Sequence, residues 1–187
     1  YVRALTDFCN EDLSAFFFDI RKDSLYCDAP TDPRRMAYRT VLDLLFHALV
    51  RWAAPVLVFT AEEVWAARYP EAGSVHLLEW PEVPEVEVDA LISKWTAIRD
   101  QRMLANEQIE PLRREKVIGS SLEAEYIYPG DPGDVDMAEI LIVAAVHRGP
   151  TEVRKTENHK CGRCWRHLPE VSEDGALCGR CETVVNG

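Results

Sequence analysis

Four of the six cysteines form the densest chemical pattern in this sequence of 187 residues. They make two Cys-x-x-Cys turns, at residues 161–164 and 178–181, with thirteen residues between them. Each turn is tight enough for two thiolates to face one ion, and two such turns at this separation are typical of a tetrahedral zinc site. Four thiolates leave no open position for a catalytic water, so the role of the metal is structural. We predict one Zn2+ per chain, held by Cys161, Cys164, Cys178 and Cys181.

Other chemistry fits these cysteines less well. A disulfide framework needs an oxidising compartment, and the sequence shows no secretory leader. An iron–sulfur cluster also uses four thiolates, but usually with other spacings. The segment between the turns has few apolar residues, so metal binding would supply its folding stability, on the order of 10 kcal/mol. Cys9 and Cys27 lie far away in sequence, in predicted helices, where we expect buried thiols.

Basic residues surround the two turns, and a tryptophan directly follows the first. Residues 148–187 contain seven Lys/Arg against six Asp/Glu, whereas residues 1–147 contain 14 against 26. Net acidity argues against indiscriminate nucleic-acid binding but allows a local basic patch. An aromatic face among guanidinium groups is typical of proteins that stack unpaired bases and hold phosphates. The predicted tRNA-binding residues here are Lys160, Arg163, Trp165, Arg166 and Arg180. Alternatively, Trp165 packs over the zinc site as an apolar plug, which so small a module needs.

The rest of the sequence shows no catalytic pattern. It has no glycine-rich phosphate loop, no Gly-x-Ser-x-Gly and no His-Glu-x-x-His. Its carboxylates form no pair that indicates acid–base work. The most apolar stretch, residues 41–59, is interrupted by Asp43, His47 and Arg51, a polar stripe on an amphipathic helix. We therefore predict neither an active site nor a membrane span in these residues.

Most of this sequence is predicted to be helical. Residues 1–27 predict a helix with a break near Asn10, and Asp32-Pro33 predicts the start of a helix that ends near Ala53. The apolar face of this second helix is predicted to be Ala37, Val41, Leu44, Leu45, Ala48 and Trp52. Near its start it carries Arg34, Arg35 and Arg39, which we predict as a further tRNA contact.

Two later segments carry clear start and stop signals. Thr60 and Glu63 predict a capping box, and Asp89 predicts the cap of a long helix that stops at Gly119. Pro111 predicts a kink or a break in that helix. Alternating side chains then predict a strand over residues 122–128. Residues 151–160 are a further strand candidate, and residues 140–146 predict either a strand or a short helix.

Four segments resemble landmarks of one family, in the expected order. Residues 12–26 resemble the start of the helical anticodon-binding domain of class I aminoacyl-tRNA synthetases of the Ile/Val/Leu/Met group, and residues 54–55 followed by 60–65 resemble its next landmark. Residues 116–124 resemble the segment that ends its last long helix. Residues 160–165 and 177–181 resemble the C-terminal zinc finger of bacterial isoleucyl-tRNA synthetases. A related finger occurs in formamidopyrimidine-DNA glycosylases, but the preceding helical segments are unlike those enzymes.

The resemblance implies a function, and it implies that two domains of the whole enzyme lie outside this sequence. It implies binding of the anticodon stem and loop of tRNA(Ile), within a ligase that attaches isoleucine to this tRNA using ATP. The sequence begins with Tyr1 rather than Met, so we expect a piece of a longer protein. The ATP-binding catalytic domain and the editing domain would lie outside this piece. We expect the N-terminal catalytic domain of the same polypeptide as a partner, a monomer, and a cytoplasmic location.

The predicted fold class is mainly α. We expect a helical-bundle anticodon-binding domain over residues 1–118, a small α/β region over 119–155 and a C-terminal four-cysteine zinc finger over 156–187. The competing hypothesis is a zinc-stapled protein-interaction module that binds no nucleic acid, which suits the acidic helical portion. Salt dependence separates the two, because binding to phosphates weakens steeply as salt is added.

Overall fold

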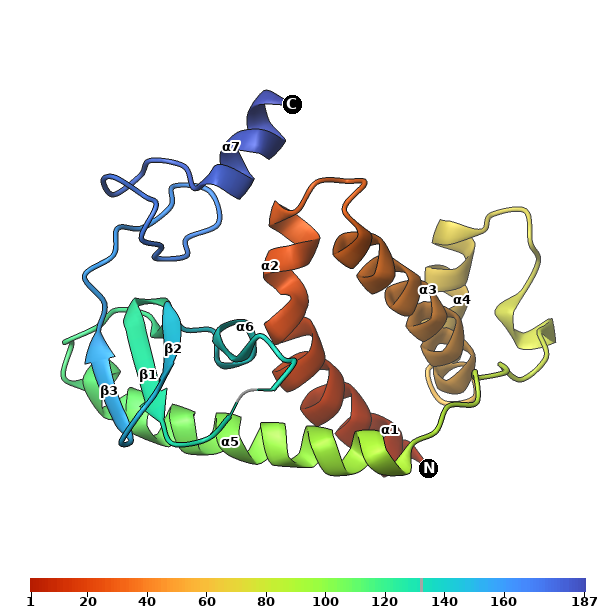
Figure 1. Cartoon of the computed structure of the whole chain (residues 1–187). Coiled ribbons are helices and arrows are strands. Elements are labelled where there is room, and N and C mark those ends of the chain that lie inside the picture. Colours follow the sequence, from red (N-terminus) through yellow and green to blue (C-terminus); the bar gives the residue numbers. More distant parts are fainter. Residues whose placement is uncertain (132) are drawn as a thin grey trace. The chain divides into compact units, whose positions relative to one another are not determined.

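The computed structural model describes residues 1–131 and 133–187 and is mainly α-helical, as predicted (Figure 1). A small sheet and a cluster of four cysteines lie in the C-terminal part of the chain, after the long helix at residues 89–114. Backbone contacts divide the chain into two compact units, residues 1–19 with 30–86 and residues 20–29 with 87–187. The three-domain division of the sequence stays a prediction. Among the described residues, no helix combines the length and the apolar character needed to cross a membrane.

The first unit is built from helices. Its elements are α1 (Val2–Asp7), the π-helical segment η1 (Phe8–Phe18), α3 (Pro33–Ala53), α4 (Val58–Arg68) and the 3-10 turn η2 (Val75–Leu77). The predicted break at Asn10 is wrong, because the chain stays helical there. The helix changes type instead, widening to the π form in which each N–H reaches the fifth preceding carbonyl.

A side-chain cap accounts for the start of α3, whereas the cap predicted for α4 does not form. Asp32 accepts hydrogen bonds from the backbone N–H of Arg34 (2.8 Å) and Arg35 (3.4 Å), which confirms the predicted cap, and α3 ends at Ala53 as predicted. The predicted capping box at Thr60 is wrong, because α4 already begins at Val58. The neighbouring carboxylate of Glu62 instead accepts from Ser74 Oγ at 2.9 Å and fixes η2.

A core cluster of the first unit lies between the carboxyl half of α3, α4 and η2. It consists of Val50, Ala54, Ala61, Trp65 and Val75. The predicted apolar face of α3 is therefore only partly buried: Ala48 is buried, but Val41 is 40% exposed and Leu44 is 47% exposed. These two lie between Tyr38, which is buried, and the carboxyl half of α3. His47, on the predicted polar stripe, has a local partner, because its Nε2 lies 3.0 Å from Tyr69 Oη.

The second unit combines helices with a small sheet and the cysteine cluster. Its elements are α2 (Asp19–Cys27), α5 (Asp89–Arg114), the 3-10 turn η3 (Ser121–Glu123), β1 (Ala124–Tyr128), α6 (Met137–Leu141), β2 (Ala145–Arg148), β3 (Glu152–Lys155) and α7 (Gly179–Asn186). Helix α5 continues past Pro111 without the predicted break. It ends before Gly119, because Lys116 adopts a left-handed conformation (φ 60°) and Val117 N–H donates to Leu112 O at 2.9 Å.

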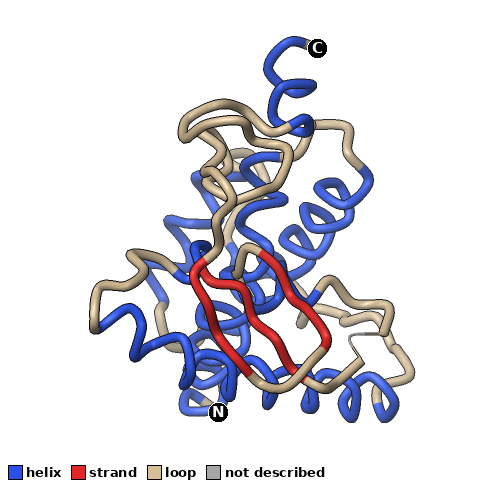
Figure 2. The backbone as a smooth tube through the Cα atoms, turned by 60° about the vertical axis from the view of Figure 1, so that its left-hand side comes forward, coloured by secondary structure: helices blue, strands red, loops and turns tan. Residues whose placement is uncertain are grey.

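The sheet has the order β2-β1-β3, with β2 parallel and β3 antiparallel to β1. Figure 2 shows its strands side by side in red. The strand predicted over residues 122–128 is confirmed at 124–128, and the candidate over 151–160 forms a strand at 152–155 only. Residues 140–146 prove to be divided between α6 and β2, and Ile142 ends α6 in a left-handed conformation. The alternate residues of β1 are buried, and the hydroxyl of Tyr126 accepts a hydrogen bond from Gln101 Nε2 at 2.9 Å. This bond ties the central strand to α5.

Candidate metal centre and nucleic-acid interface

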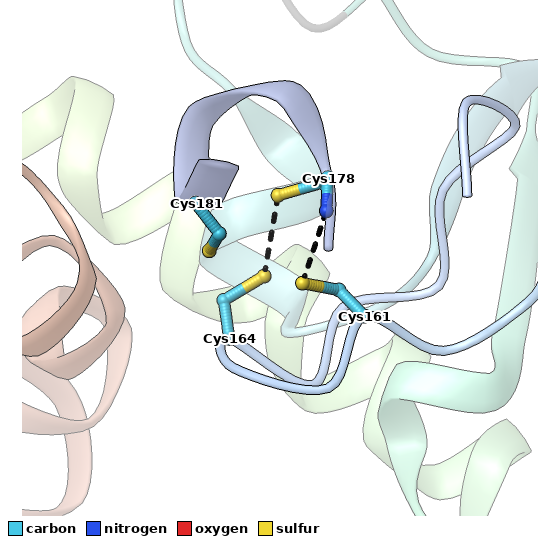
Figure 3. A group of neighbouring side chains, drawn as sticks. All are labelled: Cys161, Cys164, Cys178 and Cys181. Carbon is cyan, nitrogen blue, oxygen red and sulfur yellow. Dashed lines mark hydrogen bonds between the residues drawn. The ribbon is translucent and has the colours of Figure 1, made fainter. Parts of the chain in front are cut away.

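The four predicted zinc ligands converge on one point (Figure 3). Their sulfur atoms all lie within 4.8 Å of one another, and all four residues are buried. The Sγ atoms of Cys164 and Cys178 are 3.8 Å apart. Four sulfurs placed tetrahedrally at the usual zinc–sulfur bond length are also about 3.8 Å apart. The donor set and its spacing therefore fit a zinc ion that all four thiolates would hold.

Close backbone packing shapes the first turn. A Cβ added to Gly162 would lie 2.4 Å from the carbonyl oxygen of Gly175, so no larger residue fits without moving the backbone. Gly162 N–H donates to Ala176 O at 3.0 Å, and Gly175 N–H donates to Lys160 O at 2.9 Å. Gly175 itself has a φ of +98°, which favours glycine. These contacts pin the loop between the turns against the first turn.

Hydrogen bonds and burial shift the pKa values of the thiols in opposite directions. Burial alone raises the pKa of Cys161, but backbone N–H groups, including that of Cys178 at 3.3 Å, outweigh it and lower this pKa to about 6. Burial raises the pKa of Cys164 to about 12, against hydrogen bonds from the Arg166 backbone and the Arg180 side chain. Zinc binds the thiolate form. The bound metal would thus offset the cost of a buried charge at Cys164.

Small apolar side chains, rather than the tryptophan, fill the interior of the knuckle, by which we mean residues 156–187. Val171 is buried against the cysteines, and Leu168, Ala176 and Leu177 pack around it. The side chain of Trp165 is 61% exposed, which contradicts the plug interpretation. Its φ of 66° is uncommon for a bulky residue and strained. Lys160 Nζ lies 5.4 Å from the centre of the Trp165 ring, within cation–π range.

The structure divides the predicted tRNA-binding residues into two groups. Arg163 and Arg180 contact the protein itself, at the end of α2. Lys160 is exposed and Arg166 is half-buried, and neither forms an ion pair within the part of the chain that the structure describes. In the first unit, Arg34 and Arg39 are exposed and Arg35 is half-buried. RNA contact by all of these residues stays a prediction.

Sequence reasoning missed the part that α2 plays at this centre. Cys27 is buried as predicted, but it packs in the same cluster as the four zinc-site cysteines. Burial raises its pKa to about 11. Asp23 and Asp28, which bind Arg180, were not singled out either. A signal was present, because these carboxylates sit near a helix end that has no basic residue in its last turn. Cys9, predicted to be buried, is half-buried.

Comparison with known proteins identifies the helical part first. Residues 1–128 match the family model described as the anticodon-binding domain of tRNA ligase. The chain belongs to this family. Residues 158–184 match a second family model, the zinc finger found in FPG and IleRS. The two matches together cover α1 to α5, the first strand and the four cysteines, and the resemblance drawn from the sequence is confirmed.

The most similar curated relatives that we compared share one name. The isoleucine–tRNA ligase of Zymomonas mobilis is 59% identical over 99% of this chain. Those of Gluconobacter oxydans and Agrobacterium fabrum are 50% and 45% identical, over 98% and 92% of the chain. The chain spans only 22%, 21% and 20% of these relatives. The comparisons favour a tRNA-recognition part over an interaction module without nucleic acid.

Proposed function

We propose that this chain is the tRNA-recognition portion of an isoleucine–tRNA ligase and binds the anticodon stem and loop of tRNA(Ile). The family match supports the tRNA part of this proposal, and the names of the relatives support isoleucine. The observation that carries it is the exposed ring of Trp165, held in a strained backbone conformation beside the ammonium group of Lys160. Strain of this kind clusters at functional sites.

The knuckle offers two kinds of contact to RNA. The Trp165 ring provides a face for an unpaired base, and such stacking contributes on the order of 1–3 kcal/mol per base. Lys160 and Arg166 provide positive charge for phosphates beside it. Contacts to the sugar-phosphate backbone supply most of the affinity, and base contacts supply the discrimination. Arg34, Arg35 and Arg39 at the start of α3 offer a second basic stretch. The bound zinc would supply a closed crosslink that shapes this surface.

The proposal for the whole protein follows from the lengths of the relatives. The chain spans about a fifth of each relative, and we assign the attachment of isoleucine to tRNA(Ile) with ATP to residues outside it. These residues would form the catalytic domain that acts on the 3′ end of the tRNA. We propose a monomeric, cytoplasmic enzyme in which this chain holds the anticodon end.

The test is the binding of two RNAs over a range of salt concentrations. One is a tRNA(Ile) transcript, and the other has the same stems with its anticodon-loop bases replaced. We expect log K to fall linearly with log salt, and the altered RNA to bind about tenfold more weakly at every salt concentration. Arg166→Ala should reduce the salt slope by about one, as for one lost phosphate contact. Equal affinity for both RNAs, or binding insensitive to salt, would contradict the proposal.

A further inference from the structure

Arg163, in the first Cys-Gly-Arg-Cys turn, reaches the carboxyl end of α2. Its Nη1 donates to the carbonyl oxygen of Cys27 at 2.6 Å, and its Nη2 donates to that of Tyr26 at 3.3 Å. The same Nη1 lies 3.5 Å from Sγ of Cys181, in the other turn. One guanidinium group thus joins the last carbonyls of a helix to a sulfur of the metal site.

Arg180, in the second turn, reaches the same helix end through carboxylates. It binds both oxygens of Asp23, at 2.7 and 3.0 Å, and its Nη1 donates to Asp28 Oδ1 at 2.8 Å. The Asp28 side chain is 5% exposed, and its other oxygen accepts from Ser24 Oγ at 2.5 Å. Arg180 also hydrogen-bonds the Cys164 side chain, in the first turn. The arrangement mirrors that of Arg163.

Helix α2 needs these cations. A helix carries partial negative charge at its carboxyl end, where carboxylates are unfavourable and cations are favourable. Asp23 and Asp28 lie at this end, and the last turn contains no basic residue. A buried carboxylate without a partner is also costly, and so are helix carbonyls without donors. The required charges and donors come from residues more than 130 positions later in the chain.

The metal site needs the same cations for a related reason. Four thiolates and one Zn2+ carry a net charge of −2, and burying that charge without compensation is unfavourable. The Arg163 guanidinium lies between this anionic centre and the last carbonyls of α2, and that of Arg180 lies between it and the carboxylates of Asp23 and Asp28. Partners of this kind, outside the ligands themselves, commonly tune a metal site.

We propose that Arg163 and Arg180 are positioning residues, which fasten the knuckle to the carboxyl end of α2 and couple zinc retention to the order of that helix end. This proposal differs from the sequence prediction that both arginines contact RNA. A positioning residue changes affinity without removing a phosphate contact, whereas an RNA-contacting residue removes one. The two hypotheses therefore differ in the salt slope of tRNA binding and in the behaviour of α2 in the absence of RNA.

The first experiment needs no RNA and uses the zinc-loaded chain. Amide hydrogen exchange is followed by mass spectrometry in residues 20–29, and zinc release to 4-(2-pyridylazo)resorcinol is followed by absorbance. We expect Arg180→Ala to raise both the amide exchange rate and the rate of zinc release about tenfold or more, because hydrogen bonds to charged groups are lost. Arg180→Lys should restore part of the protection, since lysine keeps the charge but not the two-pronged geometry. The matched control is Arg166→Ala, which removes the same charge from the same knuckle and should change neither rate.

A second arm separates positioning from RNA contact. Arg163→Ala and Arg180→Ala should weaken tRNA binding while leaving its salt slope unchanged. The proposal is overturned if the arginine variants exchange and release zinc like the parent chain, or if each lowers the salt slope by about one. Because the exchange and zinc readouts involve no RNA, they stand even if the tRNA proposal fails.

Discussion

The two Cys-Gly-Arg-Cys turns are identical in sequence, yet they sit in different surroundings. In the first turn, Gly162 packs against the carbonyl of Gly175, and the next residue after the turn is the exposed Trp165 in a left-handed conformation. In the second turn, Gly179 starts α7, and its nearest neighbour is the carboxylate of Glu170, 3.8 Å from an added Cβ. Identical motifs therefore do not have identical requirements.

The difference shows which parts of the motif belong to the metal and which to the fold. All four cysteines converge, so the ligand role is common to both turns. Glycine is required in one turn only, where the loop between the turns closes on it. Both arginine side chains reach the carboxyl end of α2, but their hydrogen-bond acceptors differ. Arg163 donates to backbone carbonyls and Arg180 to carboxylates. The aromatic face that we assign to RNA belongs to the first turn alone.

The largest expected effect comes from removing one ligand. Cys178→Ser should abolish zinc binding and unfold the knuckle, because the knuckle depends on the metal for its stability. The first unit should keep its helices, since it has its own core around Trp65. Zinc analysis and circular dichroism of the purified chain check both points. A parent chain that contains two disulfides and no zinc would contradict the metal assignment.

A smaller effect should separate the two glycines. Gly162→Ala should lower the free energy of unfolding of the knuckle by about 1–3 kcal/mol, as overpacking does, because the new Cβ meets backbone. Gly179→Ala is the matched control and should be neutral or slightly stabilising, since alanine favours a helix. Zinc retention against increasing chelator, measured for both variants, tests this difference. Equal losses in the two variants would contradict the distinction between the turns.

Local signals were readable from the sequence, and long-range ones were not. The cysteine spacing, the cap at Asp32 and the end of α3 at Ala53 depend on neighbouring residues and were predicted correctly. The capping box at Thr60 and Glu63 is wrong because α4 begins two residues earlier, at Val58, so Thr60 lies inside the helix. Arg180 and Asp23 are 157 residues apart in the sequence, so no local pattern predicts their contact. The π-helical segment at Asn10 likewise has no simple local signature.

The strain at Trp165 makes the central claim directly testable, because glycine adopts its backbone conformation freely. If the ring is there for RNA, Trp165→Gly removes the stacking face and relieves about 1 kcal/mol of backbone strain. We predict that this variant retains zinc at least as well as the parent and binds the tRNA(Ile) anticodon stem-loop about 10- to 100-fold more weakly. Parallel titration of zinc and RNA on the two proteins gives the answer. Unchanged RNA affinity with retained zinc would contradict the claim that this face of the knuckle reads tRNA.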